Sequence, residues 1–296
     1  MTASTDVTVE ATSALSLGAR RRQEDALATS FSQGSDIGFA VLSDGMGGHN
    51  AGDIASRVIV TEIFAELTLR LAREDFRTNR TPEILRSATS IANACLKAHI
   101  QANPECGGMG GTVLVTVVTG GWLYWVSVGD SPLYLFRDGR LSQLNADHSL
   151  APQIDHMVRQ GLIDSATALN HPQRNCLTSA LTGDEIAEID CPDQPFALRP
   201  DDIVIAASDG LQFVSEDTIQ AILTQVHREP ASCVADALMS GVAALDDPEQ
   251  DNVSLVVLNI EDRTERAAAA GRYGTAKGGA FRALKSALPL FADSRR

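Results

Sequence analysis

Five short acidic motifs restrict the fold of this chain more than any other feature. Four of their aspartates stand at the end of, or just before, a run rich in Val, Ile, Leu or Ala. The motifs are Glu24-Asp25, Asp44-Gly45, Gly129-Asp130, Ser208-Asp209-Gly210 and Asp251-Asn252. A single Asp-Gly pair is more often a turn than a ligand, but unrelated turns are not expected to place an acid beside a strand so regularly. We therefore predict strands that bring these carboxylates to one edge of a sheet, where their oxygens suit hard divalent cations.

Apolar periodicity predicts an antiparallel β structure with helices in pairs. Buried strands are expected over residues 37–43, 112–119, 122–128, 133–137, 203–207 and 253–260. Helices are expected over residues 51–72 and about 82–99, and two more are expected to begin near Glu216 and Pro230. Gly120-Gly121 and Asp138-Gly139 predict tight turns. The strands from residue 112 to residue 137 are therefore expected to form one continuous antiparallel meander.

The helix over about 82–99 has the clearest beginning. Thr81 suits the N-cap position and Pro82 suits the first turn. Helical spacing predicts an inner face made of Ile84, Ala88, Ile91 and Cys95.

One domain is the simplest reading of residues 8–261, because neither a linker nor an internal repeat interrupts them. A flap is expected at about residues 149–175, which are polar and lack a clear period. Residues 262–296 carry eight Arg or Lys and three Asp or Glu, a net charge of +5. Composition predicts a disordered or loosely docked tail. The alternative is a docking or autoinhibitory segment that folds over an acidic cleft.

Charge and composition exclude several classes of protein. The formal charge of −14 argues against nucleic-acid binding, which needs a basic surface. No apolar stretch approaches the ~18 residues of a membrane span, and residues 1–12 lack the apolar region of a signal peptide. The five cysteines are scattered without a Cys-x-x-Cys pair, which favours free thiols in a reducing compartment. We expect a cytoplasmic monomer.

The order of the motifs resembles that of the metal-dependent protein serine/threonine phosphatases of type 2C, in their compact bacterial form. Arg20 before Glu24-Asp25 matches the opening segment of that family, and residues 43–49 match its second motif. The remaining matches are Gly110-Gly111-Thr112, Gly129-Asp130-Ser131, Asp147-His148-Ser149, Ser208-Asp209-Gly210 and Asp251-Asn252. The resemblance runs from about residue 12 to residue 260. It implies an α+β fold, a four-layer α-β-β-α sandwich with two central antiparallel sheets flanked by helices.

The resemblance assigns metal binding to seven residues. They are Glu24, Asp25, Asp44, Gly45 through its backbone carbonyl, Asp130, Asp209 and Asp251. Asp44, Asp209 and Asp251 match the main ligands. Asp130 matches the residue that helps Asp209 to hold a third, weaker ion. Two to three Mg²⁺ or Mn²⁺ ions are implied, and an all-oxygen ligand set agrees with that choice.

The catalytic residues that the resemblance implies are Arg20, Asp44 and Asp209. Arg20 matches the arginine that binds the substrate phosphate, and a guanidinium offers two parallel donors to phosphate oxygens. Arg21 and Arg22 are adjacent, so the assignment rests on the distance from Arg20 to the Glu-Asp pair. Two cations that share a water lower its pKa and align it for in-line attack on phosphorus. We expect this water to hydrolyse phosphoserine and phosphothreonine in proteins.

Some positions depart from the family pattern or have two readings. Met46 stands where some members carry a histidine that acts as general acid, so the leaving group must take its proton from water or another residue. His49 is a candidate, although a histidine at a helix start is more often structural. We expect His148 to hold the entry to the flap by hydrogen bonds. Arg159 and Arg174 are expected to be surface residues, with contact to a protein substrate as the alternative.

Several functions stay open within this reading. The leading one is a phosphatase that opposes a bacterial serine/threonine kinase. The alternatives are a phosphatase dedicated to one regulatory phosphoprotein, and a catalytically silent signalling or binding module on the same fold. The complete set of acidic residues favours an enzyme, and the acidic body disfavours a nuclease.

Overall fold

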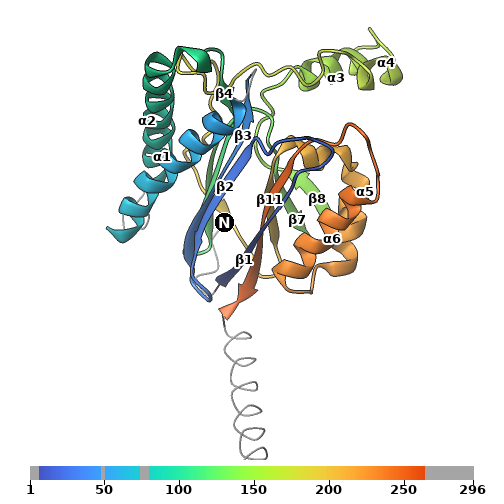
Figure 1. Cartoon of the computed structure of the whole chain (residues 1–296). Coiled ribbons are helices and arrows are strands. Elements are labelled where there is room, and N and C mark those ends of the chain that lie inside the picture. The colour runs from blue at the N-terminus through green and yellow to red at the C-terminus, as the bar shows by residue number, and fades with distance from the viewer. Residues whose placement is uncertain (1–6, 48–50, 74–79, 264–296) are drawn as a thin grey trace, which may run out of the picture.

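Two antiparallel sheets pack face to face, and helices cover both outer faces (Figure 1). The computed structural model describes residues 7–47, 51–73 and 80–263. The first sheet has the order β1 (Val7–Ser16), β11 (Val253–Asp262), β10 (Ile203–Ala207), β7 (Leu133–Arg137) and β8 (Arg140–Gln143). The second has the order β2 (Asp25–Phe31), β3 (Ile37–Met46), β5 (Val113–Thr119), β6 (Trp122–Val128) and β9 (Phe196–Ala197). A two-residue strand, β4 (Gly110–Gly111), pairs with the end of β3.

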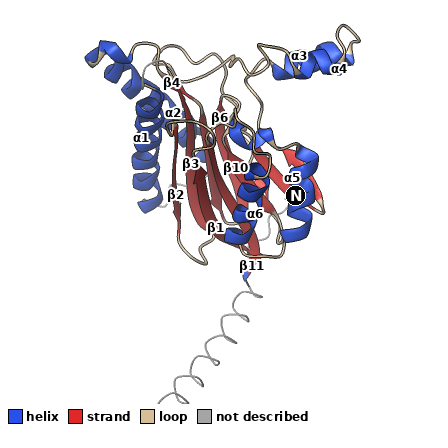
Figure 2. Cartoon of the chain, turned by 45° about the vertical axis from the view of Figure 1, so that its right-hand side comes forward, coloured by secondary structure: helices blue, strands red, loops and turns tan. Residues whose placement is uncertain are grey.

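Three apolar layers hold these elements together. Leu42, Leu114 and Val256 belong to the layer between the two sheets. The helices α1 (Gly52–Ala72) and α2 (Thr81–Ala102) pack on the second sheet, and α5 (Glu216–Val226) and α6 (Ala231–Ala243) pack on the first. The four-layer α-β-β-α sandwich is therefore confirmed (Figure 2).

Strand β3 shows why the central strands read as unbroken apolar runs. Phe39 and Val41 face the helical layer of α1, while Ala40 and Leu42 face the layer between the sheets. Successive side chains of a strand point to opposite faces, so both sets are buried. The predicted strand 37–43 is confirmed and continues to Met46.

The structure corrects three predictions. Strand β7 pairs with β10 and β8 in the first sheet, so the meander predicted for residues 112–137 ends at β6 and the chain crosses to the other sheet. Thr81 is the first helical residue of α2, and Arg80 holds the N-cap position. The inner face of α2 is also rotated, because Ile91 is 41% exposed while Leu85 and Leu96 are fully buried.

The predicted flap contains two short helices that stand apart from the sandwich in both views (Figures 1 and 2). They are α3 (Ala151–Arg159) and α4 (Ser165–Leu169). Arg174 Nη1 and Nη2 donate hydrogen bonds to the two carboxylate oxygens of Asp155, at 2.6 and 3.0 Å, which ties the end of the flap to α3. Among the residues that the structure describes, the remaining helical segments are the 3-10 helices η2 (Pro104–Cys106) and η3 (Asp209–Phe213).

Two further sequence predictions concern the chain as a whole. All five cysteines are free, as expected. Within the part of the chain that the structure describes, no helix is both long enough and apolar enough to cross a membrane. The tail predicted for residues 262–296 lies outside the described residues from residue 264 onward, and so does His49.

Candidate active site

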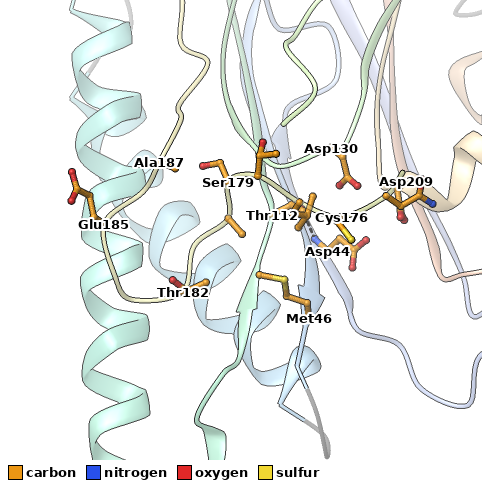
Figure 3. Close-up of a pocket in the computed structure, with 14 residues that line it drawn as sticks. Asp44, Met46, Thr112, Asp130, Cys176, Ser179, Thr182, Glu185, Ala187 and Asp209 are labelled. Atoms are coloured by element: carbon orange, nitrogen blue, oxygen red, sulfur yellow. Dashed lines mark hydrogen bonds between the residues drawn. The ribbon is translucent and has the colours of Figure 1, made fainter. Parts of the chain in front are cut away.

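The five predicted aspartates come together at one end of the sandwich. Asp25 begins β2 and is the register partner of Asp44, near the end of β3. Asp130 follows β6, Asp209 follows β10, and Asp251 precedes β11. Apart from burial, which has the largest effect, the charges of Asp209, Asp25 and Asp130 raise the pKa of Asp44. The charges of Asp209 and Asp251 likewise raise the pKa of Asp25, so these carboxyl groups lie close together. We call these five residues the acidic cluster; Figure 3 shows three of them, Asp44, Asp130 and Asp209, beside one pocket.

Burial places these carboxyl groups where their charged forms are costly. Burial raises the pKa of Asp44 well above its usual range, and the nearby charge of Asp209 raises it further. Burial is also the largest cause that raises the pKa of Asp25 to about 6 and that of Asp130 to about 8. Without a cation, the acidic cluster therefore retains protons that free aspartates lose.

We expect the metal-free protein to become less stable as the pH rises from 6 to 8. Asp130 keeps its proton in the folded state up to about pH 8, whereas an ordinary aspartate ionises near 3.8. The folded state thus binds more protons than the unfolded chain, so the free energy of unfolding falls by about 1.4 kcal/mol per pH unit for each retained proton. Thermal unfolding in the presence of a chelator should show a decrease in Tm of several degrees.

Manganese supplies the control for this pH dependence. A bound cation competes with protons for the carboxylates, so Mn²⁺ should stabilise the protein more at pH 8 than at pH 6. A metal-free Tm that stays constant or rises between pH 6 and pH 8 would contradict the assignment of retained protons to the acidic cluster.

Hydroxyl side chains hold two of the aspartates in place. The sequence patterns assigned no role to these side chains. Ser208 Oγ donates to Asp25 Oδ2 at 2.8 Å and accepts the backbone N–H of Ser254 at 3.0 Å. Thr112 Oγ1 accepts the backbone N–H of Asp44 at 2.9 Å and lies 2.9 Å from the hydroxyl of Ser131. The signals in the sequence are that Ser208 and Ser131 stand next to acidic motifs and that Thr112 belongs to the matched motif Gly110-Gly111-Thr112.

Gly45 and Glu24 meet the first turn of α1. The backbone N–H of Gly45 donates to the carbonyl of Glu24 at 3.1 Å. A Cβ on Gly52 would lie 2.8 Å from the Gly45 carbonyl oxygen and 2.9 Å from Glu24 Oε1, so only glycine allows this approach. Burial is the largest cause that raises the pKa of Glu24, and the nearby carboxylate of Asp53, which the sequence analysis missed, also raises it.

Arg20 contacts the acidic cluster directly. Its Nη2 lies 2.6 Å from Asp251 Oδ2, while the other oxygen of that carboxylate accepts the backbone N–H of Asn252 at 2.7 Å. The Arg20 side chain is 53% exposed, so about half of its surface remains open to solvent. Arg21 and Arg22 are exposed, and neither forms an ion pair with another residue that the structure describes. The structure thus distinguishes Arg20 from its two neighbours.

The residues of the acidic cluster fit a site for hard divalent cations. Asp25 Oδ1 and Asp209 Oδ1 are buried and have no hydrogen-bond partner among the described residues. Buried oxygens without partners are costly unless something else binds them. Within residues 7–47, 51–73 and 80–263, no three Asp, Glu, His or Cys side chains already surround a single point as metal ligands. Mg²⁺ does not need such a group, because it keeps several waters and binds through one or two carboxylates together with substrate oxygens.

Two cavities open on either side of Asp130 and Asp209, which line both. One, of about 600 Å³, runs toward residues 175–187 and is lined by Asp44 and Met46 (Figure 3). The other, of about 730 Å³, lies between the flap and η3, and Arg159 is one of its lining residues. The acidic cluster is therefore accessible from solvent through both cavities.

The remaining predicted residues lie around this site. His148 is buried, and its Nδ1 accepts the backbone N–H of Gly129 at 3.1 Å, which agrees with the predicted structural role. Arg174 is held by Asp155 in the flap. Arg159 is exposed, as expected for a surface arginine.

Comparison with known proteins gives a consistent picture. The family described as Protein phosphatase 2C matches residues 17–241. The serine/threonine phosphatase stp of Listeria welshimeri is 30% identical over 224 residues, which cover 74% of this chain and 84% of that protein.

Solved structures agree with this match. The crystal structure of the Mycobacterium tuberculosis serine/threonine phosphatase PstP/Ppp has a TM-score of 0.66 at 29% identity and covers 86% of this chain and 99% of that chain. The catalytic domain of the phosphatase PstP with two manganese ions has a TM-score of 0.68 at 27% identity, with 86% and 100% covered. The chain therefore belongs to the protein phosphatase 2C family and is a protein phosphatase of the bacterial type.

Proposed function

We propose that this protein hydrolyses phosphoserine and phosphothreonine in other proteins with the help of two to three Mg²⁺ or Mn²⁺ ions. The observation that carries the proposal is the acidic cluster, to which five separate segments contribute one aspartate each, with Arg20 bonded to its edge. Relatives named as serine/threonine phosphatases support the substrate class. The two manganese ions of the PstP catalytic domain support the choice of metal.

The acidic residues would hold the cations. We assign Asp44, Asp209 and Asp251 as the main ligands. The carbonyl of Gly45 and the carboxylates of Glu24, Asp25 and Asp130 complete the set. When bound, the cations would supply the positive charge that activates a water for attack on phosphorus and offsets the charge of the phosphate oxygens.

The other groups of the site bind the substrate. Arg20 has an exposed guanidinium beside Asp251, and a phosphate dianion would draw it into a paired hydrogen-bond contact. Such a contact strengthens as negative charge grows on the phosphate oxygens in the transition state. Met46 lines the cavity where a proton donor would be useful, but a thioether carries no proton to give. We assign protonation of the leaving serine or threonine oxygen to solvent water.

The substrates would be phosphoproteins made by a serine/threonine kinase, and we place the reaction in the cytoplasm with the protein acting as a monomer. We assign residues 8–261 as the catalytic domain and residues 149–175 as its flap. By composition, residues 262–296 are a basic segment that follows this domain in the sequence. Three things support these assignments: the family of the chain, the chemistry of the site and the composition of the sequence.

Hydrolysis of para-nitrophenyl phosphate tests the function. The purified protein should be active with Mn²⁺ or Mg²⁺, and a chelator should abolish turnover until excess metal is restored. Phosphoserine and phosphothreonine peptides should release phosphate faster than a phosphotyrosine peptide of the same sequence. Turnover that persists in full after chelation would refute the metal assignment, and preference for phosphotyrosine would refute the substrate class.

A further inference from the structure

The loop between β1 and β2 carries one group that the proposed function uses to bind phosphate and one that it uses to hold a cation. Residues 17–24 include Arg20 near the middle and Glu24 at the end. Neither residue lies within a strand, so the positions of both depend on what holds the loop.

The side chain of Asn252 holds this loop at both ends. Its Nδ2 donates to the carbonyl of Leu17 at 2.9 Å and to the carbonyl of Arg22 at 2.9 Å. Its Oδ1 accepts the backbone N–H of Glu24 at 2.7 Å. The residue is only 3% exposed, so water does not replace these bonds easily.

Backbone contacts of residues 250–252 also hold the loop of residues 17–24. The backbone N–H of Ala19 donates to the carbonyl of Gln250 at 2.9 Å. Gly18 has a φ of +58°, and a Cβ there would lie 2.1 Å from the carbonyl oxygen of Asp251. The loop therefore lies closely against residues 250–252, and its middle residue, Arg20, reaches Asp251 from that position.

We propose that Asn252 is a positioning residue that sets Arg20 against the acidic cluster by closing the loop of residues 17–24. The inference rests on the proposed function, in which Arg20 binds the substrate phosphate. Asn252 follows Asp251 in the chain, so one short segment supplies a carboxylate to the acidic cluster and also fixes the arginine that faces it.

An asparagine suits this task for a chemical reason. The amide offers two N–H donors to the two carbonyls and an oxygen acceptor to the N–H of Glu24. A carboxylate at this position would accept only and would face two carbonyl oxygens without a proton between them. A serine or alanine is too short to span the loop.

A double-mutant cycle tests the inference. Four proteins are compared, namely the wild type, Asn252→Ala, Arg20→Ala and the double variant, each loaded with Mn²⁺. For each we measure the kinetics with para-nitrophenyl phosphate and the competitive inhibition constant of inorganic phosphate. Asn252→Ala should raise both KM and the phosphate inhibition constant by about tenfold, since misplacing a binding group by about 1 Å is enough for such losses. The double variant should be no worse than Arg20→Ala, because the effect of Asn252 passes through Arg20.

Asn259, which lies in β11, provides a matched control. It is buried and donates one hydrogen bond, from Nδ2 to the carbonyl of Glu229 at 3.0 Å, in the half of β11 that is farther along the strand from Asp251. Asn259→Ala should lower Tm without changing phosphate inhibition. If Asn252→Ala does not fold, Asn252→Ser replaces it, since serine stays neutral and lacks both amide donors.

The outcomes separate the inference from the proposed function. A wild type that does not hydrolyse para-nitrophenyl phosphate would refute the proposed function itself. An active wild type whose Asn252 variants keep the phosphate inhibition constant of the wild type would overturn only the positioning role. Effects of Asn252→Ala and Arg20→Ala that add in full would overturn it as well, because they would show that Asn252 acts independently of Arg20.

Discussion

Replacing Asp209 by asparagine is expected to lower kcat by on the order of 10³-fold while making the metal-free protein more stable. Asp209 is close enough to Asp44 and Asp251 for their charges to interact, and it lines both cavities. An amide oxygen is a weaker ligand for Mg²⁺ or Mn²⁺ than a carboxylate oxygen. The loss of activity should therefore exceed that of any substitution outside the acidic cluster.

The stability change has the opposite sign for an electrostatic reason. Burial raises the pKa of Asp209, and the charge of Asp251 raises it further, so the ionised form is unfavourable in the folded protein. The unfolded chain ionises near an ordinary aspartate value, so the cost is present at every pH above that value. Asparagine cannot ionise, so the substitution removes this cost from the folded protein. At pH 8, in a chelator, we expect a Tm a few degrees above that of the wild type.

The exposed Asp236 of α6 is a suitable control for this prediction. Asp236→Asn removes one charge from the same protein but lies outside the acidic cluster, so kcat and Tm should both stay close to the wild type. The metal-site assignment would be wrong if Asp209→Asn kept the wild-type rate. The electrostatic account would be wrong if that variant were less stable than the wild type without metal.

Sequence patterns predicted the strands that deliver the acids because those strands are buried on both faces. The expected strand 203–207 is β10 with the same bounds, and β3 and β11 begin where they were expected. The ends of such strands are marked by the first polar residue. Local sequence alone therefore places Asp209 correctly after β10, whereas Asp44 lies inside β3, which continues to Met46.

Long-range contacts explain what the patterns missed. Strands β1 and β2 mix small and polar residues with few large apolar ones, so neither has the signal of a central strand. The short segment after β6 gives no sign that the chain changes sheet before β7. The role of Asn252 depends on hydrogen bonds to residues 228 to 235 positions away, which no local period reveals.

Substituting Arg20 by alanine is expected to lower kcat/KM by about 10²- to 10³-fold, with most of the loss in phosphate binding. Arg20 is the arginine of the loop that contacts the acidic cluster, through Asp251 at 2.6 Å. A phosphate dianion loses its paired donors when the guanidinium is removed. Kinetics with para-nitrophenyl phosphate at saturating Mn²⁺ should show a higher KM and a weaker inhibition by inorganic phosphate.

The two neighbouring arginines provide matched controls for this prediction, because Arg21→Ala and Arg22→Ala remove the same charge from the same loop. Both side chains are exposed, so each variant should stay within about twofold of the wild type in kcat/KM. A general attraction between a basic loop and a phosphate would make the three variants equally weak, and added salt would reduce the differences from the wild type. A specific contact predicts that only Arg20→Ala loses kcat/KM, and that it does so at every salt concentration. Equal losses at all three positions would therefore rule out Arg20 as the phosphate ligand.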